Sequence, residues 1–315
     1  MDKKCNIIII GFGSIGKRHY QNLRTLGYHN VSVYDIDTKT VGAGIRALTS
    51  IGGNALKQFD IAFVCNPSNL HVRTALRCAK AGCHLFIEKP LSDTVAGIAE
   101  LETVCRDKKL VRMVACNYLF HKGLAVMRRA LESGRYGKPV LSRVIAGYSI
   151  PVHRPYIYET LKETGGAERL IMDSGSHLVN YLEFLLGHIK KYSVCTGDVS
   201  MLGIRGEEAA ALVFVHENGV LSTAVIDYVS RKRAHFIDIV TDKGTLTIDF
   251  MDDSVVFADE RRIKVLYHGE KNTNQMFIDE LKHFLQCVAH GKKPLQDIVG
   301  GKAVVKLLST ARGKI

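Results

Sequence analysis

A glycine-rich segment directly after an apolar run constrains this chain more than any other feature. Residues 7–19 read IIIIGFGSIGKRH, the pattern of a buried strand, a tight turn and the start of a helix. Gly11 permits the turn, Gly13 leaves room for a phosphate to approach the backbone, and Gly16 lets the helix pack against the strand. The first N–H groups of the helix and its positive dipole end then favour an anion. The segment predicts a dinucleotide-binding turn formed by Gly11, Phe12, Gly13, Ser14, Ile15 and Gly16.

An acidic residue follows the second predicted strand at the spacing that such a turn requires. Residues 31–34 read VSVY and are followed by Asp35, nineteen residues after Gly16. A carboxylate there accepts hydrogen bonds from the adenosine ribose and repels a 2′-phosphate. We therefore expect NAD rather than NADP as the cofactor. The structural alternative is a glycine turn in which Asp35 only caps the next segment.

The first half of the chain alternates between short apolar runs and helix-like stretches. This alternation predicts a doubly wound parallel sheet. Gly27 and Gly82 stand where helices should end. Between Asp35 and Phe59 there is room for a single short helix, where a Rossmann domain often has a fuller unit. The expected strands are 6–10, 31–34, 61–65, 84–87 and 111–116.

The pattern changes near residue 120, where helix-like segments are followed by a run of strands. Residues 245–250 alternate between apolar and polar side chains, and Asn218-Gly219 and Lys243-Gly244 are typical hairpin turns. We expect an α+β domain with a large open, mainly antiparallel sheet that has one helical face and one free face. A free face of this kind pairs with another subunit, so we also expect a homo-oligomer, a dimer or a tetramer. The expected helices are 122–133 and 172–186, with a strand at 140–148 between them.

Composition limits the class of protein. The chain has 315 residues, of which 46% are hydrophobic and 23% charged, as in a globular protein of two domains. We expect no membrane association, since no apolar run reaches the length of a span and the N-terminal apolar stretch leads into the glycine turn without a cleavage site. Eight scattered cysteines without a CxxC pair predict a cytoplasmic location and no metal site.

The net charge of +12 favours anionic ligands. Nucleic acid is one candidate, but the basic residues are spread along the chain. The dense run at residues 231–233 is short, and a solvated strand end explains it equally well. We therefore expect no nucleic-acid partner and a small anionic substrate, such as a phosphorylated or nucleotide-linked sugar.

Polar residues follow three of the expected parallel strands, at the edge where doubly wound sheets bind ligands. They are Asn66-Pro67-Ser68, Glu88-Lys89-Pro90 and Asn117. A partly desolvated lysine beside a cationic nicotinamide has its pKa lowered towards the range of an acid/base group. A surface Glu/Lys pair beside a turn proline is the alternative.

Asp173 and His177 lie four residues apart in an apolar segment that predicts a helix. Both side chains then project from one face and can meet one substrate hydroxyl. Imidazole is well suited to accept and return a proton near neutral pH. Alternatively, Asp173 serves only the positive end of the helix dipole.

The order of these motifs resembles the Gfo/Idh/MocA oxidoreductases, named for glucose-fructose oxidoreductase and inositol dehydrogenase. The resemblance rests on GFGSIGKRH, CNPSNLH, AGCHLFIEKPLS, Asn117, the Asp173/His177 pair and a closing helix in GKKPLQDIVGGKAVVKLL. It implies a Rossmann domain over residues 1–120 and a substrate-binding and oligomerisation domain over 121–315, whose last helix packs back on the first. It also implies NAD(P)-dependent transfer of a hydride to or from a sugar, cyclitol or nucleotide-sugar carbon.

The resemblance also implies roles for individual residues. Lys89 matches the catalytic lysine, His177 the proton-transferring histidine and Asp173 the substrate-positioning acid, while Pro90 matches a proline that often follows a cis peptide. Beyond the glycine turn, the implied cofactor-binding residues are Asp35, Asn66, Pro67, His71, Glu88, Lys89 and Asn117. The implied substrate-binding residues are Lys89, Asn117, Arg154, Tyr156, Asp173 and His177.

The chain departs from the family pattern at two places, the short stretch after Asp35 and the segment that starts at Gly165-Gly166. Residues 148–160 resemble a stretch of members tied to nucleotide-sugar metabolism, and the alternative is an ordinary loop. Two other functions stay open at this point. One is a glycoside hydrolase that uses NAD transiently, and the other is an NAD-binding regulator without catalysis.

Overall fold

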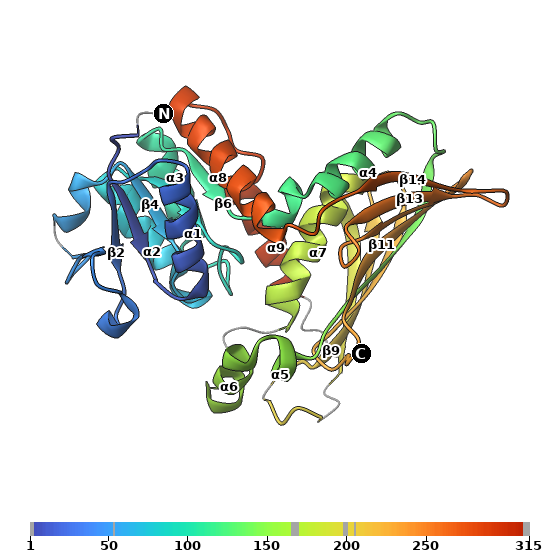
Figure 1. Ribbon diagram of the computed structural model, residues 1–315, viewed down its shortest axis with the longest axis horizontal. Helices are drawn as coiled ribbons and strands as arrows, with labels where there is room; N and C mark the ends of the chain where they lie inside the picture. The colour runs from blue at the N-terminus through green and yellow to red at the C-terminus, as the bar shows by residue number, and fades with distance from the viewer. Residues whose placement is uncertain (1–2, 53, 165–169, 198–200, 205, 311–315) are drawn as a thin grey trace. The chain divides into compact units, whose positions relative to one another are not determined.

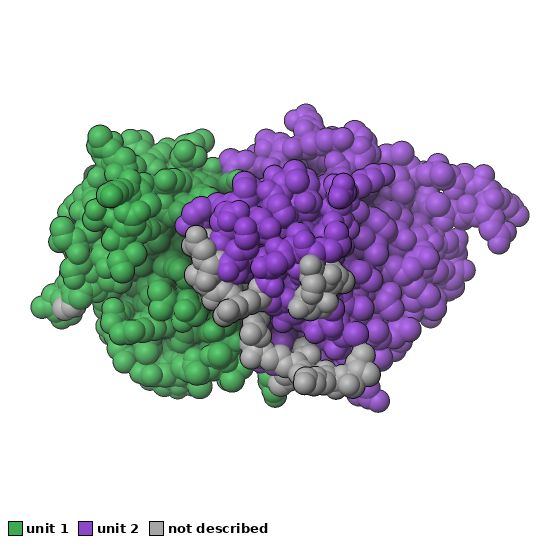
Figure 2. Space-filling view, turned by 90° about the horizontal axis from the view of Figure 1, so that it is seen from below, with its two compact units in different colours: residues 1–117, 277–306 green, residues 118–276, 307–315 purple. Residues whose placement is uncertain are grey.

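The computed structural model describes residues 3–52, 54–164, 170–197, 201–204 and 206–310 (Figure 1). The chain forms two compact units, which are coloured separately in Figure 2. Unit 1 comprises residues 1–117 and 277–306, and unit 2 comprises residues 118–276 and 307–315. None of the helices in the described ranges combines the length and the hydropathy needed to cross a bilayer.

Unit 1 is built on a six-stranded sheet in which every neighbouring pair is parallel. The spatial order is β3-β2-β1-β4-β5-β6, the order of a doubly wound dinucleotide-binding sheet, as predicted. β1 and β4 are buried along their whole length, because helices cover both faces of such a sheet. The strands are β1 (Ile7–Ile10), β2 (Val31–Tyr34), β3 (Arg46–Ala47), β4 (Ile61–Val64), β5 (His84–Ile87) and β6 (Arg112–Val114).

The helices of unit 1 come from both ends of the chain. Gly27 and Gly82 follow α1 and α2 with φ angles of +87° and +101°, as expected for glycines that end helices. In the returning segment, the backbone N–H of Val114 donates to the carbonyl of Gln296 at 3.0 Å, which ties the last part of the chain to β6. The helices that lie wholly or mainly in unit 1 are α1 (Ser14–Thr25), α2 (His71–Ala81), α3 (Ile98–Asp107), α8 (Thr273–His290) and α9 (Ile298–Thr310).

The stretch between Asp35 and Phe59 differs from the single short helix that its length suggested. Its described residues form two 3-10 turns, Thr38–Thr40 and Ala55–Gln58, and the two-residue strand β3. The segment is rich in glycine and has no sustained apolar period, so it cannot bury one face of a helix.

Unit 2 is built on an eight-stranded sheet with the order β14-β13-β12-β11-β7-β10-β9-β8. All its neighbouring pairs are antiparallel except β7 with β10. Asn218-Gly219 and Lys243-Gly244 lie in the predicted hairpin turns. The strands are β7 (Pro139–Gly147), β8 (Ile189–Gly197), β9 (Ala209–His216), β10 (Leu221–Asp227), β11 (Ala234–Thr241), β12 (Gly244–Asp249), β13 (Ser254–Ala258) and β14 (Ile263–His268).

Helices cover one face of this sheet, as Figure 1 shows for α4 and α7. Leu246 and Ile248 of β12 are fully buried beneath that layer, whereas Leu221 and Val225 of β10 are each 44% exposed. The prediction of one covered face and one free face is therefore confirmed. The helices of unit 2 are α4 (Lys122–Glu132), α5 (Ile150–His153), α6 (Pro155–Thr164) and α7 (Leu170–Leu186).

Candidate functional site

The glycine turn after β1 has the local geometry that a dinucleotide site needs. Gly11 has a φ of +94°, and a side chain there would collide with the backbone of Cys65 and Asn66. Gly16 packs against the carbonyl of Gly11, where a side chain would also collide. A Cβ atom added at Gly13, in contrast, would meet no described atom within 4 Å apart from its chain neighbours, so the space beside this residue is open. The three glycines are thus required for a turn, for close packing and for an open approach to the start of α1.

Asp35 lies directly beside this turn. Its Oδ2 accepts a hydrogen bond from the backbone N–H of Phe12 at 2.5 Å, and its Oδ1 accepts one from the N–H of Asp37 at 2.9 Å. The carboxylate is therefore held at the end of β2 next to the glycine turn. This is where a ribose-binding acid is expected.

The ends of β4 and β5 are joined by a buried histidine. His71 is 2% exposed, with its Nε2 2.6 Å from the carbonyl oxygen of Asn66 and its Nδ1 2.8 Å from that of Pro90. Burial lowers the pKa of His71, while the two carbonyls oppose this effect. The Lys89–Pro90 peptide is cis, as the family resemblance predicted. His71 therefore holds the segments after β4 and β5 together.

Glu88 and His19 form a buried pair beneath the strand end that carries Lys89. His19 is fully buried, and its Nε2 lies 2.6 Å from Oε1 of Glu88. The other carboxylate oxygen of Glu88 accepts the backbone N–H of Lys89 at 3.2 Å. Burial alone would raise the pKa of Glu88, but the hydrogen bond and charge of His19, together with Lys89 and His71, hold it below its ordinary value.

A second buried acid reaches the neighbouring strand end from α8. Glu280 is fully buried, and its Oε1 accepts the backbone N–H of Cys116 at 2.5 Å, one residue before the buried Asn117. Its Oε2 has no hydrogen-bond partner among the described residues. Burial and then the charge of Glu88 raise the pKa of Glu280 well above its ordinary value. Both effects favour the protonated, neutral form of Glu280.

In unit 2, Asp173 lies in the first turn of α7, where it contacts an arginine and a tyrosine. Nη1 of Arg154 is 3.1 Å from Oδ2 of Asp173, and the hydroxyl of Tyr228 donates to the same oxygen at 3.3 Å. Burial opposes the charge of Arg154, but Asp173 and the neighbouring tyrosines raise its pKa above the ordinary value. Tyr156, on α6, is 84% exposed. The predicted residues Arg154 and Asp173 are thus in direct contact.

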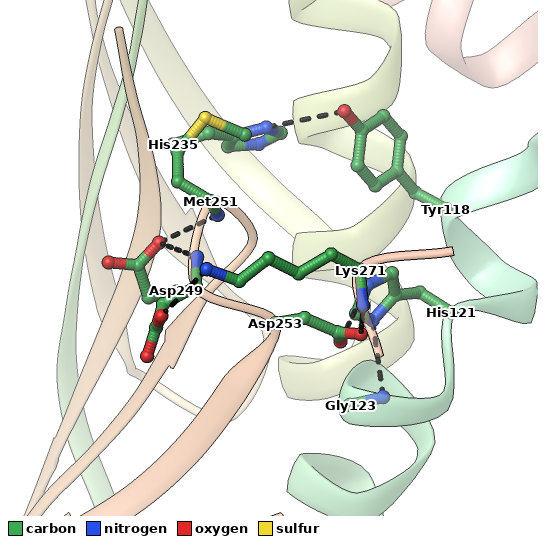
Figure 3. A network of polar contacts seen from close by, with 9 residues as sticks. Tyr118, His121, Gly123, His235, Asp249, Met251, Asp253 and Lys271 are labelled. Carbon is green, nitrogen blue, oxygen red and sulfur yellow. Dashed lines mark hydrogen bonds and ion pairs between the residues drawn. The ribbon is translucent and has the colours of Figure 1, made fainter. Parts of the chain in front are cut away.

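His177, one turn after Asp173, packs against an aromatic cluster. Its ring meets that of Tyr118 edge-on, with centroids 4.9 Å apart. The hydroxyl of Tyr118 lies 3.3 Å from Nδ1 of His235 on β11 (Figure 3). The hydroxyl of Tyr181 lies 3.4 Å from Nε2 of the same histidine. Burial, with Arg233 and His121, lowers the pKa of His235 to about 3, so this ring is neutral at physiological pH.

The start of α4, which follows Tyr118, is fixed by a second histidine (Figure 3). His121 is the N-cap of α4, and its Nδ1 accepts the backbone N–H of Gly123 at 3.1 Å. Its Nε2 lies 3.4 Å from Oδ1 of Asp253, in the turn before β13. Burial lowers the pKa of His121 against the opposing effect of Asp253. The pair ties α4 to the sheet beside the aromatic cluster.

The predicted residues thus fall into two groups. In unit 1, the glycine turn, Asp35 and the three polar strand ends share the carboxyl edge of one parallel sheet. In unit 2, Arg154, Asp173 and His177 lie around Tyr118 and Tyr228. The departure at Gly165-Gly166 lies outside the described residues. Within the described ranges, no three His, Cys, Asp or Glu side chains gather closely enough to hold a metal ion. Sequence reasoning missed His19, Tyr118, Tyr228, His235 and Glu280.

Family models match most of the chain. The model described as "Oxidoreductase family, NAD-binding Rossmann fold" matches residues 5–116, and the model of the GFO/IDH/MocA C-terminal domain matches residues 124–247. A myo-inositol 2-dehydrogenase from Thermotoga maritima is 25% identical over 322 aligned positions, which cover 95% of this chain and 92% of that protein.

Solved structures share the fold over nearly the full length. An oxidoreductase from Agrobacterium radiobacter, in complex with NAD+, L-tartaric acid and magnesium, has a TM-score of 0.85 and 17% identity over 99% of this chain and 97% of its own. A UDP-N-acetylglucosamine 3-dehydrogenase from Acidithiobacillus ferrooxidans has a TM-score of 0.81 and 18% identity, over 98% of this chain and 97% of its own.

Proposed function

Because the chain belongs to the Gfo/Idh/MocA oxidoreductase family, we propose that it is an NAD-dependent dehydrogenase of a sugar, cyclitol or nucleotide sugar. The observation that most supports this proposal is in unit 1. The open glycine turn after β1 and Lys89 after β5 stand at the same edge of one parallel sheet. This edge is where doubly wound sheets bind ligands. In this proposal unit 1 binds the cofactor and unit 2 binds the substrate.

The residues at this edge fit a dinucleotide. The N–H groups at the start of α1 suit a pyrophosphate, and the open space at Gly13 admits it. Asp35 suits a ribose with a free 2′-hydroxyl, so the proposed cofactor is NAD rather than NADP. Bound nicotinamide would supply the hydride acceptor or donor. Asn66, Pro67, Lys89 and Asn117, at the ends of the neighbouring strands, would surround its ring.

The proposed chemistry divides between proton transfer and orientation. Lys89 or His177 takes the proton of the substrate hydroxyl in the oxidation and returns it in the reduction. Asp173, held in place by Arg154 and Tyr228, orients the sugar ring. Glu88 fixes the backbone from which Lys89 projects. Such positioning supplies much of the advantage of an enzyme over free reactants.

The proposed substrate carries a negative charge. The chain has a net charge of +12. Arg154 lies between α5 and α6 and contacts Asp173, and Tyr156 lies on α6. The proposed location is the cytoplasm, since no disulfide joins the eight cysteines, all of which fall in described ranges.

Turnover tests the proposal directly. The protein is mixed with NAD or NADP and a panel of inositols, free sugars, sugar acids and nucleotide sugars, and reduced nicotinamide is followed by absorbance. One substrate group is expected to reduce NAD, and Lys89→Ala is expected to lower kcat by roughly a hundred-fold or more. The matched control is Lys80→Ala, which removes an exposed lysine that pairs with Glu100 at 2.9 Å.

NAD binding by calorimetry separates loss of chemistry from loss of fold in Lys89→Ala. Full activity of this variant would refute the assigned role of the lysine. NAD binding without net reduction over the whole panel would refute the dehydrogenase. Release of an aglycone under those conditions would instead identify a hydrolase with transient redox.

We also propose that the free face of the unit 2 sheet pairs with a second copy of the chain. Val213, Leu221 and Val225 are 41%, 44% and 44% exposed on this face. Its charged neighbours Arg143 and Asp238 pair across β7 and β11 at 3.2 Å. Because these charges neutralise each other, a partner needs apolar surface rather than complementary charge, and a second copy supplies it. Light scattering should give a dimer or tetramer that Val225→Lys dissociates, and a native monomer would contradict the proposal.

A further inference from the structure

The ion pair between Arg154 and Asp173 is partly open to solvent. The two side chains are 45% and 14% exposed, and their closest N–O distance is 3.1 Å. Arg154 also lies over the ring of Tyr148, with Cζ 5.6 Å from its centroid. Solvent screens the exposed side of this ion pair, so it is easier to open than a fully buried pair. Arg154 can therefore exchange its partner for another anion, while Tyr228 keeps its own hydrogen bond to Asp173.

A second guanidinium acts on the same group of side chains. Burial raises the pKa of Tyr118 and Tyr148, while both Arg154 and Arg233 oppose this effect. Asp173 is the carboxylate that acts on both tyrosines, and its effect has the opposite sign to that of the arginines. Among the described residues, two cations and one carboxylate act on both tyrosines.

We propose that Arg154 determines specificity by exchanging Asp173 for an anionic group of the substrate, a carboxylate or a phosphate. The inference rests on the proposed dehydrogenase function, whose substrate class it narrows. A planar guanidinium binds either anion through two parallel hydrogen bonds, a stronger arrangement than the single contact to Asp173. Asp173 then keeps Tyr228, and the oxygen that Arg154 releases accepts a hydrogen bond from a substrate hydroxyl. A neutral sugar leaves the ion pair closed.

Protection from an arginine reagent tests the exchange without turnover. The full-length protein saturated with NAD is treated with phenylglyoxal, and the modification rate of each arginine is followed by peptide mass spectrometry. The probes are inorganic phosphate, glucuronate and glucose, with sodium chloride at matched ionic strength. Arg128 is the internal control, since it pairs with Glu132 at 2.7 Å, lies over the ring of Phe184 and is 40% exposed.

Phosphate or glucuronate is expected to slow modification of Arg154 by roughly ten-fold at saturation, with Arg128 unchanged. Protection by phosphate alone would indicate a phosphate ester as substrate, and protection by glucuronate alone would indicate a sugar acid. Either result supports the exchange. Equal rates with all four solutes, or equal protection by glucose or chloride, would overturn it.

Substitutions give a second readout on whichever substrates the panel identifies. Arg154→Met is expected to lower kcat/KM for anionic relative to neutral substrates by roughly ten-fold or more, with Arg154→Lys intermediate. Arg233→Met should change this ratio in the same direction, and Arg128→Met should leave it unchanged. An unaltered ratio in Arg154→Met would overturn the proposal. Protection of Arg154 in a protein that reduces no NAD would count against the dehydrogenase and not against the anion site.

Discussion

Replacing Glu280 with glutamine is expected to stabilise the protein progressively as the pH rises. Glu280 is fully buried, and burial and the charge of Glu88 raise its pKa well above the ordinary 4.5. The folded state therefore favours the protonated form, while in the unfolded chain Glu280 ionises above pH 4.5. The folded state thus binds more protons in this range, so the free energy of unfolding falls as the pH rises.

The size of the effect follows from the pH interval. A difference in protonation costs about 1.4 kcal/mol per pH unit, so the penalty between pH 4.5 and pH 7 is at most about 3 kcal/mol. Glutamine removes this penalty because it does not titrate. Its carbonyl can still accept the N–H of Cys116, which now donates to Oε1 of Glu280. Its amide takes the place of the protonated Oε2, which has no hydrogen-bond partner in the described structure.

Thermal unfolding of wild type and Glu280→Gln from pH 4.5 to pH 8 measures the difference. For a chain of this size, Tm changes by roughly 2 °C per kcal/mol, so the gap between the two proteins should widen by up to roughly 6 °C between pH 4.5 and pH 7. The control is Glu100→Gln, an exposed glutamate of the same unit that pairs with Lys80. A gap that stays constant with pH, or that widens towards acid, would refute the assignment of Glu280 as a neutral acid.

Three further outcomes follow from other parts of the structure. Gly13→Val should weaken NAD binding in calorimetry and leave Tm unchanged, because a side chain there enters open space. Gly11→Val should lower Tm, because a side chain there collides with backbone. A lower Tm for Gly13→Val and an unchanged Tm for Gly11→Val would contradict the geometry of the turn. His121→Ala should lower the free energy of unfolding by about 1 kcal/mol in urea, since it removes the N-cap of α4. The ring protons of His235 should show no NMR titration above about pH 5, and a midpoint near the ordinary 6.5 would contradict its burial.

Local sequence pattern was enough to predict the elements with a regular hydrophobic pattern and the turns that need glycine. The apolar runs of β1 and β4, the glycines after α1 and α2 and the alternation of β12 all lie where they were expected. The short helix expected after Asp35 was wrong, because length alone suggested it and no apolar period supported it. The glycine turn itself was predictable residue by residue, since each glycine has a separate steric reason.

Contacts between distant parts of the chain were not predictable in this way. Glu280 bonds the N–H of Cys116 across 164 positions, and Tyr118 meets His235 across 117. Neither pair has a local pattern, because each depends on how whole elements pack. His19 is an intermediate case. It stands three residues after Gly16 in the glycine motif, and only its burial against Glu88 distinguishes it from a surface histidine on α1.

The course of the chain through its two units has a consequence for biosynthesis. The chain leaves unit 1 after Asn117 and returns to it at Phe277. On the ribosome, the parallel strands of unit 1 emerge long before α8, which brings Glu280 to the strand end at Cys116. Residues 118–276, which include the whole sheet of unit 2, are translated in the interval. The nascent dinucleotide-binding unit therefore lacks α8 and α9 until that sheet has been synthesised.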